Sequence, residues 1–203
     1  MRIILAIFLL NCACIVLRAP ADQPNFALSF DGVDDVVEFS GAPEIHGPHT
    51  VEAWVRPSQL QYANWVFIFG QGHAEQSDNC YRGSWLIIDR DVPQPGFAMD
   101  PAGCKNQLQL LQPATIDAWA HLTGTFDGQT MRLYVNGVLI SSRPAVHSSS
   151  SRMSAGAVFS FHPGFFGYGL HFKGDLDNLR FWRKARTSEE ILSTMNRRLT
   201  GNE

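Results

Sequence analysis

Cysteine, charge and long apolar runs are all scarce in this sequence. Four of the 203 residues are cysteine, and 17% are charged. The apolar run near the N-terminus, from Ile3 to Leu10, is shorter than the ~20 residues with which a helix crosses a bilayer. There is no Asn-x-Ser/Thr sequon, so N-glycosylation is not expected. With 45% hydrophobic residues, the chain is typical of one globular domain with a large core.

Long basic runs and the common catalytic motifs are also missing. The formal net charge is −3, and the pair Arg197-Arg198 stands close to the C-terminus. Nucleic acid and anionic membrane surfaces are therefore not expected as partners. The chain has no Gly-x-Ser-x-Gly motif of a serine hydrolase and no His-Glu-x-x-His motif of a zinc enzyme.

Residues 1–21 are predicted to be a secretory signal peptide. Arg2 precedes the apolar run, and Ala19 and Ala21 form the small-residue pattern that favours cleavage after Ala21. An uncleaved membrane anchor and a lipoprotein signal with Cys12 as acceptor are the alternatives. Cleavage would leave residues 22–203 as one secreted, extracellular domain without a membrane span, carrying 14 basic and 19 acidic residues.

The exported domain would retain two cysteines, Cys80 and Cys104. Because disulfides persist in the oxidising environment outside the cell, a Cys80–Cys104 bond is the expected state. It would close a loop of about 25 residues and stabilise the fold by roughly 3 kcal/mol in the chain-entropy view.

Short segments of alternating apolar and polar residues make up most of the remaining chain. Each is bounded by Gly, Pro, Asn, Asp or Ser, which is typical of strands separated by turns. About ten strands without an intervening long helical pattern predict an all-β sandwich or barrel. The expected strands lie at 26–30, 36–39, 50–55, 65–69, 85–88, 119–126, 131–135, 138–142, 158–161 and 176–182.

Local signals add two hairpins and one helix. Asp127-Gly128 and Asn136-Gly137 are typical of tight hairpin turns, so they predict a three-stranded meander. Thr187-Ser188-Glu189-Glu190 matches a capping box and predicts the start of a short C-terminal helix. The core is expected to contain Trp54, Trp119 and Trp182.

Five of these segments, in this order, resemble laminin G-like domains of the concanavalin A-like lectin-glucanase type and their pentraxin relatives. The resemblance covers about Phe26 to Leu192 and implies a two-sheet antiparallel jelly-roll sandwich with one short C-terminal helix. The segment from His73 to Pro113 departs from the family pattern. The matching segments are Ala27-Leu28-Ser29-Phe30-Asp31-Gly32, His49-Thr50-Val51-Glu52-Ala53-Trp54-Val55, Trp119-Ala120-His121-Leu122 with Thr125-Phe126-Asp127-Gly128, Leu133-Tyr134-Val135-Asn136-Gly137, and Phe172 to Trp182 leading into Thr187-Ser188-Glu189-Glu190.

Calcium is the cofactor that the resemblance implies. Related sandwich domains hold one calcium ion with an aspartate of the last strand and carbonyl oxygens of the first turn. Carried over, this indicates Asp177, Asp31 and the carbonyl of Gly32 as metal ligands, in a chain that also has Asp34 and Asp35 at the first turn. The alternative is that these aspartates only make turn hydrogen bonds.

A glycine- and aromatic-rich segment is the candidate ligand-binding loop. Glycines at 164, 167 and 169 disfavour a regular strand, so His162, Phe166, Tyr168 and His171 are expected on a loop that offers apolar walls and a few polar groups. Alternatively, its phenylalanines close one end of the core.

Catalysis by paired carboxylates is the third interpretation. Asp89/Asp91 and Asp175/Asp177 are two residues apart, so on a strand each pair would be separated by roughly 6.6 Å, close to the spacing in inverting glycosidases. The sequence lacks the Glu-x-Asp-x-x-Glu pattern of jelly-roll glucanases. We therefore expect a non-catalytic binding module for a glycan, or else an extracellular protein-adhesion module, and less readily a glycan-active hydrolase or lyase.

Overall fold

A computed structural model of the chain describes residues 26–39, 46–58, 66–75, 80–88, 95–99, 109–111, 118–146, 153–155, 159–160 and 171–199. The predicted signal peptide and its cleavage site lie outside these ranges. Within the described part of the chain, no helix is long and apolar enough to cross a membrane.

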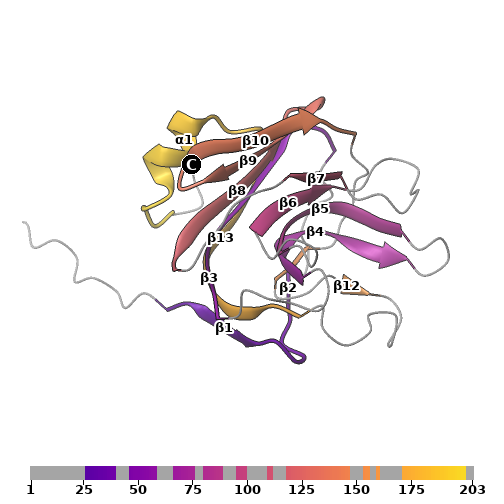
Figure 1. Cartoon of the computed structure of the whole chain (residues 1–203), viewed down its shortest axis with the longest axis vertical. Helices are drawn as coiled ribbons and strands as arrows, with labels where there is room; N and C mark the ends of the chain where they lie inside the picture. Colours follow the sequence, from indigo (N-terminus) through magenta and orange to yellow (C-terminus); the bar gives the residue numbers. More distant parts are fainter. Residues whose placement is uncertain are drawn as a thin grey trace, which may run out of the picture.

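The strands form two sheets that face each other, as the resemblance implied (Figure 1). Sheet A has the strand order β1, β13, β3, β8, β9, β10, with bounds Leu28–Asp31, Lys173–Trp182, His49–Pro57, Ala120–Phe126, Thr130–Val135 and Val138–Pro144. Sheet B has the order β2, β11, β4, β5, β6, β7, with bounds Val37–Phe39, Met153–Ala155, Val66–Glu75, Cys80–Ile88, Pro95–Met99 and Gln109–Leu111. A short strand β12, Phe159–Ser160, pairs in parallel with β4. The two-sheet antiparallel sandwich is confirmed.

The predicted first and last strands lie side by side. Strand β13 runs between β1 and β3 and is antiparallel to both. Leu28 of β1 pairs with Leu176 of β13, which pairs in turn with Val55 of β3. The two ends of the domain therefore join along one edge of sheet A, which gives the fold many contacts between residues far apart in sequence.

Both predicted hairpin turns are confirmed. Strand β9 pairs with β8 across Asp127-Gly128 and with β10 across Asn136-Gly137. Asn136 and Gly137 have φ angles of 51° and 77°, the left-handed conformation that a type I′ turn requires at both central residues. Asparagine and glycine are the residues that adopt it with the least strain.

The hydrophobic core lies between the sheets and uses one face of each strand. On β3, Val51, Ala53 and Val55 have no exposed surface and face the core, while the residues between them face away from it. The sheets approach closely at Gly124 of β8, where a Cβ atom would lie 2.2 Å from the ring of Phe97. A larger residue at this position would have to displace an aromatic side chain in a packed interior.

Helix α1, Ser188–Thr194, covers part of the outer face of sheet A (Figure 1). The predicted capping box is present: the Glu190 amide donates to Thr187 Oγ1 over 3.3 Å, and the Thr187 amide donates to Glu190 Oε2 over 3.0 Å. These bonds satisfy amides at the helix start that have no partner within the helix.

The three tryptophans predicted for the core are not in it. Trp54, Trp119 and Trp182 are absent from the buried cluster between the sheets, and strand alternation directs them to the outer face of sheet A. Trp54 and Trp182 are half-buried, and Trp119 is 36% exposed. The sequence pattern identified which residues share a face, but it did not show which face meets the other sheet.

Candidate functional site

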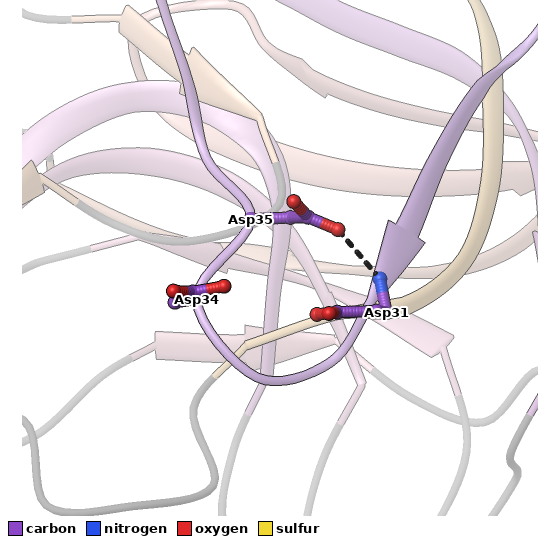
Figure 2. A group of neighbouring side chains, drawn as sticks. All are labelled: Asp31, Asp34 and Asp35. Carbon is purple, nitrogen blue, oxygen red and sulfur yellow. Dashed lines mark hydrogen bonds between the residues drawn. The ribbon is translucent and has the colours of Figure 1, made fainter.

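The turn between β1 and β2 gathers three carboxylates (Figure 2). Ligand oxygens of Asp31, Asp34 and Asp35 lie within 4.8 Å of one another. The Asp31 amide donates to Asp35 Oδ2 over 2.8 Å, and the Val33 amide donates to Asp31 Oδ1 over 2.7 Å. The turn hydrogen bonds expected as the alternative to metal binding are therefore present, and they also hold the carboxylates close together.

This cluster fits part of a calcium ligand set. Calcium takes six to eight oxygen ligands at 2.3–2.6 Å, so two ligands of one ion can lie up to about 5 Å apart. The spacing of the three carboxylates satisfies this limit. Gly32 has a φ of 82°, and a Cβ there would lie 2.8 Å from Cβ of Lys173, so glycine is required for the chain to turn here.

Asp177 is not brought to this turn. Asp31 pairs with Lys173, whereas Asp177 stands four positions further along β13 and pairs with Trp54. Four positions correspond to about 13 Å along a strand. Asp177 Oδ1 accepts from the Asn178 amide over 2.7 Å, next to a register shift in the pairing of β13 with β3. The acidic residues that accompany Asp31 are Asp34 and Asp35.

Most of the predicted ligand-binding loop lies outside the described residues. This applies to His162, Phe166 and Tyr168, and to the candidate catalytic residues Asp89 and Asp91. His171 is half-buried just before β13, and its buried Nδ1 has no hydrogen-bond partner among the residues described. The loop stays a prediction.

The predicted disulfide is likewise untested. Cys80 begins β5, where its backbone pairs with Glu75 of β4, while Cys104 lies outside the described ranges. The bond stays a prediction from the cysteine count.

The outer face of sheet A holds a buried ionic cluster that the sequence did not reveal. Glu52 of β3 has no exposed surface, and both of its carboxylate oxygens accept from Arg186 Nη1 over 3.0 Å. Trp182 Nε1 donates to Glu52 Oε1 over 2.9 Å, and Arg180 Nη1 donates to it over 3.4 Å. A buried carboxylate is tolerated only with such partners.

The two arginines connect this carboxylate to the C-terminal segment. Arg180 Nη1 donates to the Thr194 carbonyl over 3.0 Å, and Arg186 Nη2 donates to Thr194 Oγ1 over 2.7 Å and to the Glu190 carbonyl. Carbonyl groups at a helix C-terminus carry partial negative charge, which compensates the second cation. The cluster therefore attaches α1 to sheet A. In the sequence, Glu52 reads as an ordinary solvent-facing strand residue.

Two histidines are buried in neutral form. His49 Nδ1 is 2.9 Å from the Gly47 carbonyl and its Nε2 is 2.8 Å from Ser84 Oγ, so it joins sheet A to β5 of sheet B. Burial lowers its pKa to about 4. Burial, with the nearby Arg180 and Arg186, lowers the pKa of His121 to about 3. Neither side chain has exposed surface, so both histidines have a structural role.

Comparison with known proteins agrees with this architecture. Residues 31–192 match the sequence family described as the concanavalin A-like lectin/glucanases superfamily. Human pappalysin-1 is 32% identical over 188 residues, which is 85% of this chain but 11% of pappalysin-1. The mouse protein is 31% identical over 88 residues, 39% of this chain and 5% of its own length. The chain therefore spans about a tenth or less of these relatives.

Several solved structures share the fold at low sequence identity. A heptameric pentraxin of Limulus polyphemus has a TM-score of 0.60 at 18% identity, with 83% of this chain and 82% of that chain covered. The carbohydrate-binding domain CBM40 of a Ruminococcus gnavus sialidase, bound to α2,3-sialyllactose, has a TM-score of 0.61 at 12% identity, covering 82% and 95%. Domain 4 of the Geobacillus stearothermophilus arabinanase AbnA, in complex with arabinotriose, has a TM-score of 0.54 at 20% identity, covering 82% and 75%. These likenesses show the fold.

Proposed function

This chain belongs to the concanavalin A-like lectin/glucanases superfamily, and on that premise we propose that it is a secreted, non-catalytic module that binds carbohydrate with the help of a calcium ion. The supporting observation is a two-sheet sandwich shared with domains whose structures contain bound oligosaccharides. The predicted signal peptide supports an extracellular location. This chain matches 11% of the length of human pappalysin-1, which supports a module of the kind that occurs within larger proteins.

A non-catalytic role is supported by the state of the carboxylates on β13. The Asp175 carboxylate accepts from Arg56 Nε over 2.9 Å and pairs with Arg56 Nη2 over 2.7 Å. The Asp177 carboxylate accepts from the amide and the side chain of Asn178. The Arg56 ion pair occupies one oxygen of Asp175, and the Asn178 bonds occupy both oxygens of Asp177, which is not the arrangement of a free acid–base pair of carboxylates.

The carbohydrate proposal is tested on a glycan array with added calcium and again with a chelator. We expect binding of one glycan class by the secreted wild-type domain, and loss of that binding in chelator. If no glycan is bound under either condition, the proposal is wrong.

A protein-adhesion role is the second candidate, and the surface near the first turn favours it. Val33 and Val36 are 70% and 45% exposed, in the same turn as the acidic cluster of Asp31, Asp34 and Asp35. Exposed apolar side chains grouped with charge are typical of protein contact surfaces. Loss of binding to an extracellular protein in Val33→Ser, with glycan binding intact, would favour this role.

We further propose that calcium binds at the cluster of Asp31, Asp34 and Asp35. Calcium at about 100 times its dissociation constant should stabilise the fold by about 2.7 kcal/mol, which corresponds to a rise in Tm of about 5–10 °C for a domain of this size. Differential scanning calorimetry with calcium and with chelator measures this rise. We expect Asp34→Asn to abolish it.

Two matched variants make the calcium test specific. Asp127→Asn removes another exposed turn aspartate, whose Oδ1 accepts from the Gln129 and Thr130 amides, and should leave the calcium effect unchanged. Asp177→Asn should also leave it unchanged, because about 13 Å of strand separates Asp177 from the cluster. A calcium effect lost in Asp177→Asn but kept in Asp34→Asn would contradict the assignment.

A further inference from the structure

A row of polar and aromatic side chains crosses the outer face of sheet A at right angles to its strands. Asp175 of β13 pairs with Ser29 of β1 on one side and with Arg56 of β3 on the other. Because Val55 pairs with Ala120 of β8, the next residue pair in this register is Arg56 and Trp119. Ser29, Asp175, Arg56 and Trp119 therefore form one row, which we call the outer row. Three strand spacings make it about 14 Å long.

The outer row lies beside the surface that the C-terminal segment covers. In the neighbouring row, Trp54 Nε1 donates to the Met195 carbonyl over 2.9 Å, and His121 has no exposed surface. Two residues further along each strand, on the same face, Trp119 is 36% exposed and the Arg56 side chain is 53% exposed. Of the four tryptophans in the described ranges, Trp119 alone is exposed.

Contacts within the outer row fix its side chains. The Arg56 guanidinium carbon lies 5.2 Å from the centre of the Trp119 ring, a cation–π contact. Arg56 Nε and Nη2 both contact the same oxygen of Asp175, Oδ2. No hydrogen bond within the described chain involves Arg56 Nη1 or Asp175 Oδ1. The row thus presents a held aromatic ring, a donor and an acceptor side by side.

This combination matches the chemistry of a sugar. A pyranose or furanose ring offers an apolar C–H face to an aromatic ring, and its hydroxyl groups both donate and accept hydrogen bonds. Binding sites commonly pair apolar walls with a few convergent polar groups. The positive charge of Arg56 is matched by Asp175, so no unpaired cation in the row favours an acidic sugar.

We propose that the outer row is a carbohydrate-binding site for neutral oligosaccharides. Trp119 packs against the sugar ring, while Arg56 Nη1 donates to one hydroxyl oxygen and Asp175 Oδ1 accepts from a neighbouring hydroxyl. The site rests on the proposed glycan-binding function and adds its location and its preference for uncharged sugars. It lies on the helix-bearing sheet and does not use the predicted loop of His162, Phe166, Tyr168 and His171.

The test uses the secreted domain on an array of neutral and sialylated oligosaccharides, followed by calorimetric titration with the strongest-binding oligosaccharide. Trp119→Ala is expected to weaken binding about ten-fold or more, as truncation of a tryptophan anchor does. Trp119→Phe should restore most of the affinity because it keeps an aromatic ring. Asp175→Asn leaves Arg56 unmatched, so it should lower the signal from neutral glycans and raise that from sialylated ones.

Phe39→Ala is the matched control. Phe39 is also 36% exposed, but it lies on β2 of sheet B, so its truncation should change glycan affinity less than two-fold once both variants are shown by thermal unfolding to be folded. If the glycan affinity of Trp119→Ala is within two-fold of the wild-type affinity, the outer row is not the binding site. The proposed glycan-binding function would not be affected by that result. A wild-type domain that binds no oligosaccharide would overturn both.

Discussion

Glu52→Gln is expected to lower the free energy of unfolding by about 3–5 kcal/mol, the usual cost of removing one partner from a buried ion pair. The substitution keeps the shape of the side chain but removes the charge that both Arg186 and Arg180 contact. Both guanidinium groups would then remain buried without a compensating anion, because their side chains are only 3% and 7% exposed. Urea denaturation of wild type and variant measures the difference.

The same substitution should loosen α1 before the rest of the domain. Arg180 and Arg186 join Glu52 to the last turn of the helix through Thr194, so an uncompensated pair weakens the attachment of that segment. Hydrogen exchange of the α1 amides should accelerate in Glu52→Gln through local opening of the helix. Amides in β4 and β5 should exchange faster only to the extent that the free energy of global unfolding falls.

A surface pair supplies the control for Glu52. Lys184 Nζ lies 2.5 Å from Glu190 Oε1, with side chains 56% and 38% exposed, so Lys184→Gln should cost no more than about 1 kcal/mol. A loss in Glu52→Gln as small as that of Lys184→Gln would show that the cluster contributes little to stability.

Acidification to pH 4 should remove about 3 kcal/mol of stability through each of two buried histidines. Burial lowers the pKa of His49 to about 4, and burial together with nearby arginines lowers the pKa of His121 to about 3. In the unfolded chain both titrate near 6.5. Below pH 6.5 the unfolded chain therefore binds protons that the folded chain does not, so stability is fully present above pH 6.5 and is lost as the pH falls toward 4 and 3.

Urea denaturation at a series of pH values between about 7.5 and 4 measures this loss. His49→Gln keeps a polar group near Ser84 Oγ but cannot titrate. The free energy of unfolding of this variant should therefore fall by about 3 kcal/mol less than that of the wild type on acidification to pH 4. An acid loss of the same size in His49→Gln and in wild type would contradict a role for His49.

Much of the fold was predictable because its signals are local. Asn136-Gly137 specifies its hairpin through two left-handed φ angles, and Thr187 with Glu190 specifies the helix start through two hydrogen bonds within four residues. Strand alternation correctly grouped Val51 with Val55 on one face. Such features depend on neighbours in the chain, so they are visible in the sequence.

The candidate site was predictable only in part. The aspartates of the first turn are close in sequence, and Asp31, Asp34 and Asp35 are close in space. The distance from Asp31 to Asp177 depends instead on the register of β1 against β13, and period-two alternation contains no signal for it. The register of β3 against β8 likewise brings Trp119 beside Arg56, a pair 63 positions apart in the sequence.

By itself, then, the sequence determined most of the strands, the turns, the helix cap and the family, since each follows from short-range chemistry or from the order of short motifs. Strands β6, β7 and β11 were not among the expected ones. Only the tertiary structure decided that Glu52 is buried, because that requires α1 to pack over a strand face that otherwise reads as solvent-exposed. It also decided that Trp119 and Arg56 stay exposed, because the C-terminal segment covers the adjacent row of sheet A, at Trp54, and leaves theirs open. Burial of an outer sheet face is set by whichever distant segment packs on it, and alternation along one strand carries no information about that segment.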